Sequence, residues 1–377
     1  MDKDSFIHGC NRARLKLSER EHMTAAFFSR RYGETDFITG LRAIAATMVI
    51  IIHTGAFADF GAIGQTITGA GKYGVNMFFV ISGFTIAKTF TDARDYPSYL
   101  IRRLARILPL YWVIISVAFL LIQGQIIYTP IWMAKFGSAP DLYNFAMHIS
   151  MLSFLDYRVA NSILGVEWSI PIEVFCYILM PALIVFCRSI KTTVIAVLLV
   201  YILTAILALI SKKTLGTSLP VKWTPIAYGQ LFFIGMLSYH LRSKYEGYVG
   251  VKPALWIYCA LILFGGSLLF KFGGRGDTIG LATAIIIIFL TTERAGILVQ
   301  VLTFKPVLFL GSISYSVYLI HYIVILFFQK SGFIFERSYF YFLVIYGLTI
   351  TISSLTYLLI EKPSNAFGRN LVERSNN

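Results

Sequence analysis

DFITGLRAIAATMVIIIHTG, residues 36–55, has the character of a membrane helix but contains two ionisable side chains. Arg42 and His53 are eleven residues apart, close to three helical turns, so they lie on nearly the same helix face. At 1.5 Å rise per residue, they are roughly 16 Å apart along the axis. Ionisable groups inside hydrocarbon are costly, which makes both residues functional candidates. The alternative is that Arg42 reaches the headgroups on one side and His53 reaches the opposite interface.

The composition is that of a polytopic membrane protein. Of the 377 residues, 57% are hydrophobic and 14% charged, whereas about a quarter of the residues in a soluble domain are charged. The net charge of +14 is interpreted first as a topology signal, so the lipid bilayer and not nucleic acid is the expected partner. The four scattered cysteines form neither a metal-binding pattern nor a disulfide framework, and we expect no metal site.

The hydrophobic segments predict an all-α membrane bundle of about ten transmembrane helices. These segments lie at about 38–56, 74–91, 106–124, 166–187, 192–211, 222–241, 253–272, 276–292, 308–328 and 338–361. We expect a basic cytoplasmic leader at 1–36, a membrane domain at 37–363 and a short cytoplasmic tail at 364–377.

The distribution of Lys and Arg favours a plasma-membrane (cell inner membrane) protein with both termini in the cytoplasm. With this topology, cytoplasmic segments contain 21 of the 33 basic residues, external loops contain 10, and two lie within helices. The long connection 125–165 is then external and is long enough to cover a site.

YPSYLIRRLARILPLYW, residues 96–112, places a pair of arginines where a cytoplasmic loop enters a helix. Arg103 and Arg106 are three residues apart and share a helix face. The planar guanidinium donates two parallel hydrogen bonds, a geometry that suits phosphate oxygens. The alternative is an ordinary positive-inside anchor.

Three further side chains are expected near the level of His53 on the external side. Glu173, in VEWSIPIEVFCY (166–177), lies roughly 10 Å below the outer edge of its helix. His321 ends GSISYSVYLIH (311–321) and rises to a similar level, and Asn76 is a candidate for the same layer. For His321 the alternative is a hydrogen-bonded packing residue. On the inner side, Glu361 is expected to pair with an arginine.

Taken together, these stretches resemble the acyltransferase 3 family of integral membrane acyltransferases. The resemblance rests on the spacing of Arg42 and His53, on GVNMFFVISGF, on the arginine pair, and on EWSIPIEVFCY, ISYSVYLIH and IEKP, in the family's order over residues 36–363. It implies a ten-helix fold, no tightly bound cofactor, and transfer of an acyl group, expected to be acetyl, from cytoplasmic acyl-CoA. The acceptor would be a hydroxyl of an extracytoplasmic polysaccharide or lipid-linked glycan. Asn76 departs from the family, since many members have an acid there.

The resemblance and the residue pattern together assign provisional roles. Arg103 and Arg106, with Arg42, would bind the phosphates of coenzyme A, and His53 would be the general base or acyl carrier. The other expected site residues are Glu173 and Arg42 as catalytic partners, and His321, Asn76 and Tyr315 as substrate-binding residues. The alternatives are an acyltransferase for a small exported molecule or a lipid, and a transporter or flippase.

Overall fold

The computed structural model describes residues 36–92, 95–136, 139–245, 253–269, 275–290, 297–333 and 337–375. Within these ranges the chain is helical and contains no strand, which confirms the all-α class. The expected leader lies outside the described residues. The elements are α2 (Asp36–Thr54), α3 (Gly61–Ala70), η1 (Gly71–Tyr73), α4 (Gly74–Asp92), α5 (Tyr96–Gln123), α6 (Ile131–Ala134), α7 (Leu142–Ile149), η2 (Ser153–Leu155), α8 (Ser169–Ile184), α9 (Ile190–Leu215), α10 (Leu219–Lys222), α11 (Ile226–Tyr245), α12 (Pro253–Leu269), α13 (Arg275–Phe289), α14 (Ile297–Leu302), α15 (Lys305–Ser312), α16 (Ser314–Ser331), α17 (Ser338–Thr356), η3 (Tyr357–Glu361) and α18 (Lys362–Ser375).

Each of the ten apolar segments coincides with a helix or with consecutive helical elements. By length and composition, four of the described helices are able to cross a membrane, or five if the bent pair α15 and α16 is one span. The predicted number of about ten spans is therefore not confirmed. The sequence predicts one helix at 308–328, but the structure has two, α15 and α16, with a bend of 72° between them.

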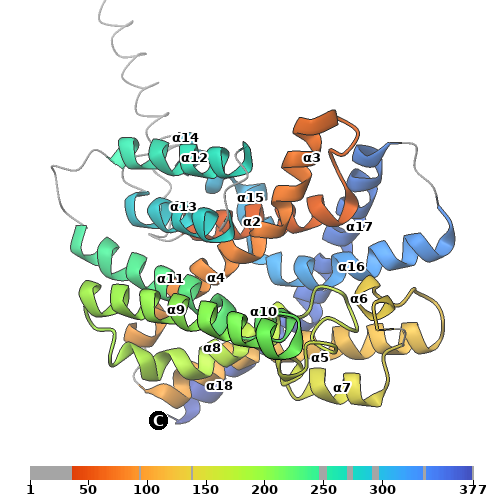
Figure 1. Cartoon of the computed structure of the whole chain (residues 1–377), viewed down its shortest axis with the longest axis horizontal. Helices are drawn as coiled ribbons and strands as arrows, with labels where there is room; N and C mark the ends of the chain where they lie inside the picture. Colours follow the sequence, from red (N-terminus) through yellow and green to blue (C-terminus); the bar gives the residue numbers. More distant parts are fainter. Residues whose placement is uncertain are drawn as a thin grey trace, which may run out of the picture.

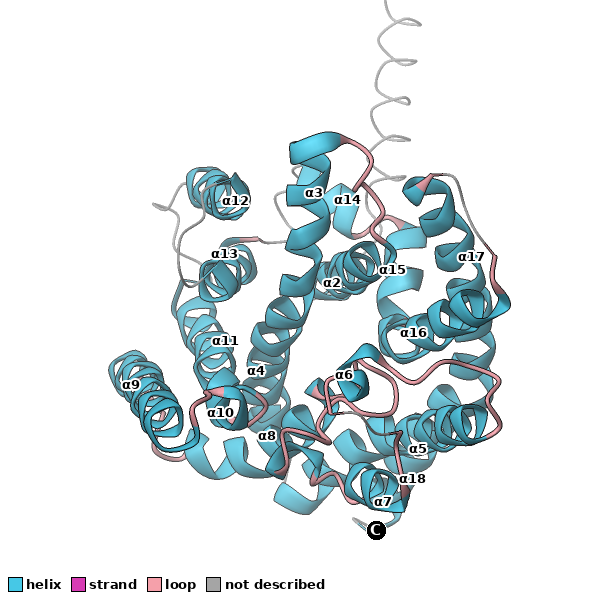
Figure 2. Cartoon of the chain, turned by 45° about the vertical axis from the view of Figure 1, so that its right-hand side comes forward, coloured by secondary structure: helices cyan, strands magenta, loops and turns pink. Residues whose placement is uncertain are grey.

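Helix α2 packs against α4, α15, α16 and α17, so the helix that contains Arg42 and His53 lies at the centre of the helical arrangement (Figures 1 and 2). Close packing against α15 depends on a glycine. A Cβ atom at Gly311 would lie 1.9 Å from the carbonyl oxygen of Thr39, closer than any side chain tolerates. Small residues at such crossings let helix backbones approach, and this brings α15 and α16 against Arg42 and His53 of α2.

The surface of the bundle is apolar where lipid would replace water. In α9, only 6% of the most hydrophobic window is buried, and leucine and isoleucine side chains cover its exposed face. Because a helix satisfies its own backbone hydrogen bonds, such a face is stable in hydrocarbon. The helix begins at a capping box made by Ser189 and Thr192 and ends at Gly216 in the left-handed conformation.

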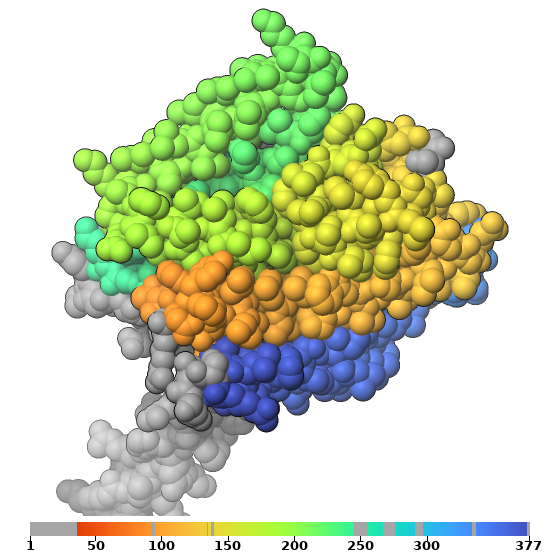
Figure 3. All heavy atoms as spheres, turned by 90° about the horizontal axis from the view of Figure 1, so that it is seen from below, coloured from red at the N-terminus to blue at the C-terminus, as the bar shows by residue number. Residues whose placement is uncertain are grey.

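The predicted tail, 364–377, corresponds to a helix of the bundle as far as the structure describes it. Helix α18 lies along α5, and Figure 3 shows the blue C-terminal segment against the orange surface of α5. Pro363 follows the π-helical turn η3 and lies in the first turn of α18. Proline is tolerated there because the first N–H groups of a helix have no partner within that helix.

Candidate active site

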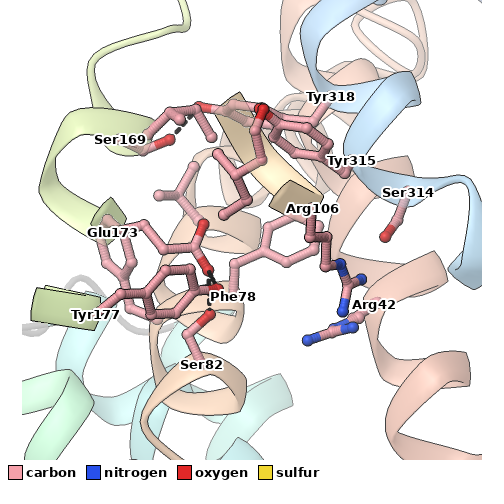
Figure 4. Close-up of a pocket in the computed structure, with 14 residues that line it drawn as sticks. Arg42, Phe78, Ser82, Arg106, Ser169, Glu173, Tyr177, Ser314, Tyr315 and Tyr318 are labelled. Atoms are coloured by element: carbon pink, nitrogen blue, oxygen red, sulfur yellow. Dashed lines mark hydrogen bonds between the residues drawn. The ribbon is translucent and has the colours of Figure 1, made fainter. Parts of the chain in front are cut away.

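Five helices, α2, α4, α5, α8 and α16, line a partly open pocket with about 540 Å³ of empty space. We call it the inner pocket. Its polar lining is supplied by Arg42, Ser82, Arg106, Ser169, Glu173, Tyr177, Ser314, Tyr315 and Tyr318. Figure 4 shows the guanidinium groups of Arg42 and Arg106 near one another on one side of this pocket.

A second hollow, of about 1480 Å³, adjoins the inner pocket, and we call it the outer hollow. Arg42 and Arg106 line both spaces, so the two hollows meet at this arginine pair. The outer hollow also contains Arg102, Arg103 and Arg369. Its single acidic lining residue among the described residues is Glu361. The excess of guanidinium groups makes this space suitable for a polyanion.

The two arginines at the junction make no direct contact with a described acid, although Glu173 and Glu361 lie near enough to interact electrostatically with them. Within the part of the chain that the structure describes, neither Arg42 nor Arg106 makes a hydrogen bond or an ion pair. Glu361, the expected partner, instead accepts a hydrogen bond of 3.0 Å from Ser316. A partly buried guanidinium without a partner is costly, and an anion of a ligand would lower that cost.

Arg103 differs from Arg106 although the two share the sequence motif. Arg103 is buried, donates hydrogen bonds to the carbonyl oxygen of Thr85 and to Oγ1 of Thr89, and lies over the rings of Tyr99 and Tyr177. Its Nη2 group is thus engaged within the protein. Arg103 thus joins helices as well as lining the outer hollow, whereas Arg106 makes no hydrogen bond to the described residues, and phosphate binding by the two arginines stays a prediction.

Glu173 does not join His53 in one polar cluster. Its Oε1 accepts hydrogen bonds from Ser82 at 2.5 Å and from Tyr177 at 2.6 Å (Figure 4). Both donors and the glutamate line the inner pocket together with Arg42. The rise per residue predicts how far Glu173 lies below the outer end of its helix, but it does not predict the direction in which the side chain points.

His53 and His321 do meet, as their predicted common depth indicated. Nδ1 of His53 lies 3.0 Å from Nε2 of His321, and the rings stack with centroids 5.2 Å apart. The ring of Tyr322 meets that of His53 edge-on at 5.0 Å. Neither histidine lines the inner pocket, although the pocket residue Tyr318 accepts a hydrogen bond from His321 through its carbonyl oxygen.

The other two expected substrate-binding residues have separate surroundings. Tyr315 lines the inner pocket and donates a hydrogen bond of 2.8 Å to the carbonyl oxygen of Ile107. Asn76 lies against α13, where a Cβ atom at Gly276 would come within 2.5 Å of its Nδ2. It lines neither of the two hollows, and its role in substrate binding stays a prediction.

Apart from Tyr315, sequence reasoning missed the hydroxyl groups that line the pocket. Ser82 is part of the quoted stretch GVNMFFVISGF, but a serine in an apolar run carries no signal of its own. It also missed a buried cluster behind the pocket, in which the ring of His148 contacts Tyr111, Glu167 and Ser162. Glu167 is fully buried and accepts backbone hydrogen bonds from Ile163 and Val166.

Comparison with known proteins decides the family. Residues 35–358 match the model of the acyltransferase domain. The chain belongs to the acyltransferase 3 family. This confirms the resemblance and the prediction of an acyltransferase, and the arginine pair and the histidine pair are thus features of a family member.

Three relatives indicate what related acyltransferases do. The chain is 25% identical over 367 residues to O-acetyltransferase OatA of Staphylococcus aureus, covering 86% of this chain and 56% of the relative. It is 25% identical over 357 residues to the putative peptidoglycan O-acetyltransferase YrhL of Bacillus subtilis, covering 88% and 55%. It is 26% identical over 364 residues to peptidoglycan O-acetyltransferase OatA of Listeria monocytogenes, covering 89% and 56%. The chain thus spans little more than half the length of these relatives. No solved structure matches the chain.

Proposed function

We propose that this acyltransferase moves an acetyl group from cytoplasmic acetyl-CoA to a hydroxyl of an extracytoplasmic cell-surface polysaccharide, with peptidoglycan as the acceptor. The observation that carries the proposal is the pair of guanidinium groups, Arg42 and Arg106, which lie at the junction of the two hollows and make no hydrogen bond or ion pair with the described residues. The acceptor follows from the names of the relatives. The enzyme would lie in the plasma membrane with both termini in the cytoplasm.

The donor would bind with its phosphates at the arginines. Arg102 and Arg369 line the outer hollow, where they would neutralise the nucleotide end of coenzyme A, and Arg106 would bind the phosphates nearest the inner pocket. The extended pantetheine arm would then enter the bundle. Arg42 and His53 belong to the same helix and are about 16 Å apart along its axis, a separation that such an arm is able to span.

His53 would act on the acceptor hydroxyl. Its neutral ring takes the hydroxyl proton at Nε2 while the hydroxyl oxygen attacks the carbonyl carbon of the thioester. The new C–O bond forms, the C–S bond breaks, and the imidazolium returns the proton to the departing thiolate. In the alternative, Nε2 of His53 attacks the thioester carbon, so that an N–C bond forms while the C–S bond breaks and the coenzyme A thiolate leaves. The acceptor oxygen then attacks the acetyl carbon, the N–C bond breaks, and the hydroxyl proton neutralises the thiolate.

The test uses two donors, acetyl-CoA and acetyl-pantetheine, which lacks the nucleotide and all phosphates. Purified protein in detergent is assayed for formation of acetate esters on isolated peptidoglycan glycan strands. Arg106→Ala should raise the KM for acetyl-CoA at least about tenfold, the loss of one charge-assisted contact, and leave the KM for acetyl-pantetheine unchanged.

The matched control is Arg158→Ala, because Arg158 is exposed and pairs with Asp156 at 2.8 Å, outside both hollows. This variant should behave like the wild type with either donor. Equal losses with both donors would refute the phosphate contact. Failure of the folded wild-type protein to acetylate glycan strands, with transfer to another acceptor intact, would refute the proposed acceptor.

A further inference from the structure

The hydrogen-bond partners of His321 determine which of its ring nitrogens carries the proton. Nδ1 of His321 lies 2.7 Å from the carbonyl oxygen of Tyr318 and 3.3 Å from that of Val317. A carbonyl oxygen only accepts hydrogen bonds, so Nδ1 of His321 must be the donor. In the neutral ring, Nε2 of His321 therefore has a lone pair and accepts.

This fixes the state of the neighbouring histidine as well. Nε2 of His321 faces Nδ1 of His53 at 3.0 Å, so Nδ1 of His53 donates and its Nε2 is left unprotonated. Among the residues that the structure describes, none donates a hydrogen bond to Nε2 of His53. His53 is partly exposed, whereas His321 is completely buried. His53 thus has an accessible basic nitrogen, and His321 has none.

The packing around the two rings holds this arrangement. The rings stack on one another, and Tyr322 meets His53 at 5.0 Å and His321 at 6.0 Å between ring centroids, edge-on in both cases. A rotation of either ring would break the hydrogen bond between them and the stacking. The chain of hydrogen bonds ends at the main-chain carbonyl of Tyr318, which cannot take a proton, so the chain orients His53 but does not conduct protons away.

We propose that His321 is a positioning residue, which holds His53 in the tautomer and orientation that present Nε2 to the acceptor hydroxyl. The proposal rests on the proposed function in one respect, the role of His53 as base or acyl carrier. It replaces the expected role of His321 in substrate binding, because a completely buried ring does not reach a glycan. It also explains why two histidines from distant parts of the chain meet inside an apolar bundle.

The test compares two substitutions of the same residue. In His321→Gln, the amide oxygen is able to accept from Nδ1 of His53 and the amide N–H to donate to the carbonyl of Tyr318. In His321→Leu neither contact is possible. We expect His321→Leu to lower kcat by roughly 10²–10⁴-fold, the range for general-base catalysis, with KM for acetyl-CoA within twofold of wild type. His321→Gln should keep most of the wild-type kcat. The control is His240→Gln, which alters a histidine that contacts the carbonyl oxygen of Cys187. This variant should have the kcat and KM of the wild type.

Nitrogen-15 NMR of histidine-labelled wild-type protein in detergent tests the tautomer without any change in the fold. The resonances of His53, assigned with His53→Ala, should show a protonated Nδ1 and an unprotonated Nε2, and in His321→Leu the second tautomer should appear. A protonated Nε2 in the wild type would overturn the proposal, as would equal kcat values for the Gln and Leu variants. A raised KM for the glycan with unchanged kcat would overturn it in favour of substrate binding. By contrast, full activity of His53→Ala would refute the proposed function of His53 and leave the tautomer measurement standing.

Discussion

Arg103 on α5 donates a hydrogen bond of 2.7 Å to the main-chain carbonyl oxygen of Thr85 on α4. This contact distinguishes Arg103 from Arg106, which occupy similar positions in the sequence motif. Arg103→Ala removes a buried donor and leaves the Thr85 carbonyl without that partner, so it should lower the free energy of unfolding by about 1.5–3 kcal/mol. Arg106→Ala removes a group that makes no hydrogen bond to the described residues and should leave the thermal midpoint in detergent nearly unchanged. Equal midpoints for the two variants would contradict this division of roles.

Glu173 places a negative charge in the pocket that Arg42 and Arg106 line. Glu173→Gln keeps the shape and the two hydroxyl contacts from Ser82 and Tyr177 but removes the charge. Binding of the anionic coenzyme A should become tighter, by roughly two- to tenfold, because a nearby like charge is lost. Isothermal titration with coenzyme A measures this change, and Glu373→Gln on the exposed face of α18 serves as control. Weaker binding of coenzyme A by Glu173→Gln would show that the carboxylate positions the donor.

The sequence predicted the helical segments well and their arrangement only in part. Hydrophobic length and the 1.5 Å rise give the extent of a helix and the height of each residue on it. The depth of His53 and His321 in the membrane predicted that the two residues lie at the same level. The direction of a side chain around its helix, however, depends on the helices packed against it. Glu173 therefore lies with Ser82 in the inner pocket, and Asn76 faces α13. The sequence also does not predict that Arg369 lines the outer hollow, because this position depends on the packing of α18 along α5.

The crossing of α2 and α15 should be sensitive to a single methyl group. In Gly311→Ala the new Cβ would meet the carbonyl oxygen of Thr39 at 1.9 Å, so the helices must separate at a cost of about 1–3 kcal/mol. Gly69 is the matched control, since it lies in α3 with nothing within 4 Å of an added Cβ. Gly69→Ala should be neutral or stabilising by about 0.4–1 kcal/mol. Thermal unfolding in one detergent compares them, and a neutral Gly311→Ala would show that this crossing is not tightly packed.

An aspartate outside the helices gives the stability a pH dependence at acid pH. Oδ2 of Asp59 accepts a hydrogen bond of 2.6 Å from the backbone N–H of Ser338, at the start of α17. This bond, followed by that from the Ser338 side chain, lowers the pKa of Asp59 below its ordinary value. Its stabilising contribution is therefore present above the ordinary pKa of about 3.9 and is lost as the pH falls toward the folded-state value. The difference in melting temperature between wild type and Asp59→Asn should shrink from pH 7 to pH 3, and a difference independent of pH would exclude this linkage.

The proposed reaction requires that the outer hollow open to the cytoplasm and that residues 125–165 lie outside. Single cysteines at two exposed positions, Lys135 in this segment and Glu373 on α18, test both requirements in a protein whose four native cysteines have been replaced. In intact cells, a membrane-impermeant maleimide should label Lys135→Cys and not Glu373→Cys, whereas permeabilised cells should label both. The prediction follows from the excess of basic residues, including Arg102 and Arg369, on the side of the outer hollow, since positive charge is retained in the cytoplasm. The reverse labelling pattern would place the arginines outside the cell, where acetyl-CoA is absent, and would refute transfer across the membrane.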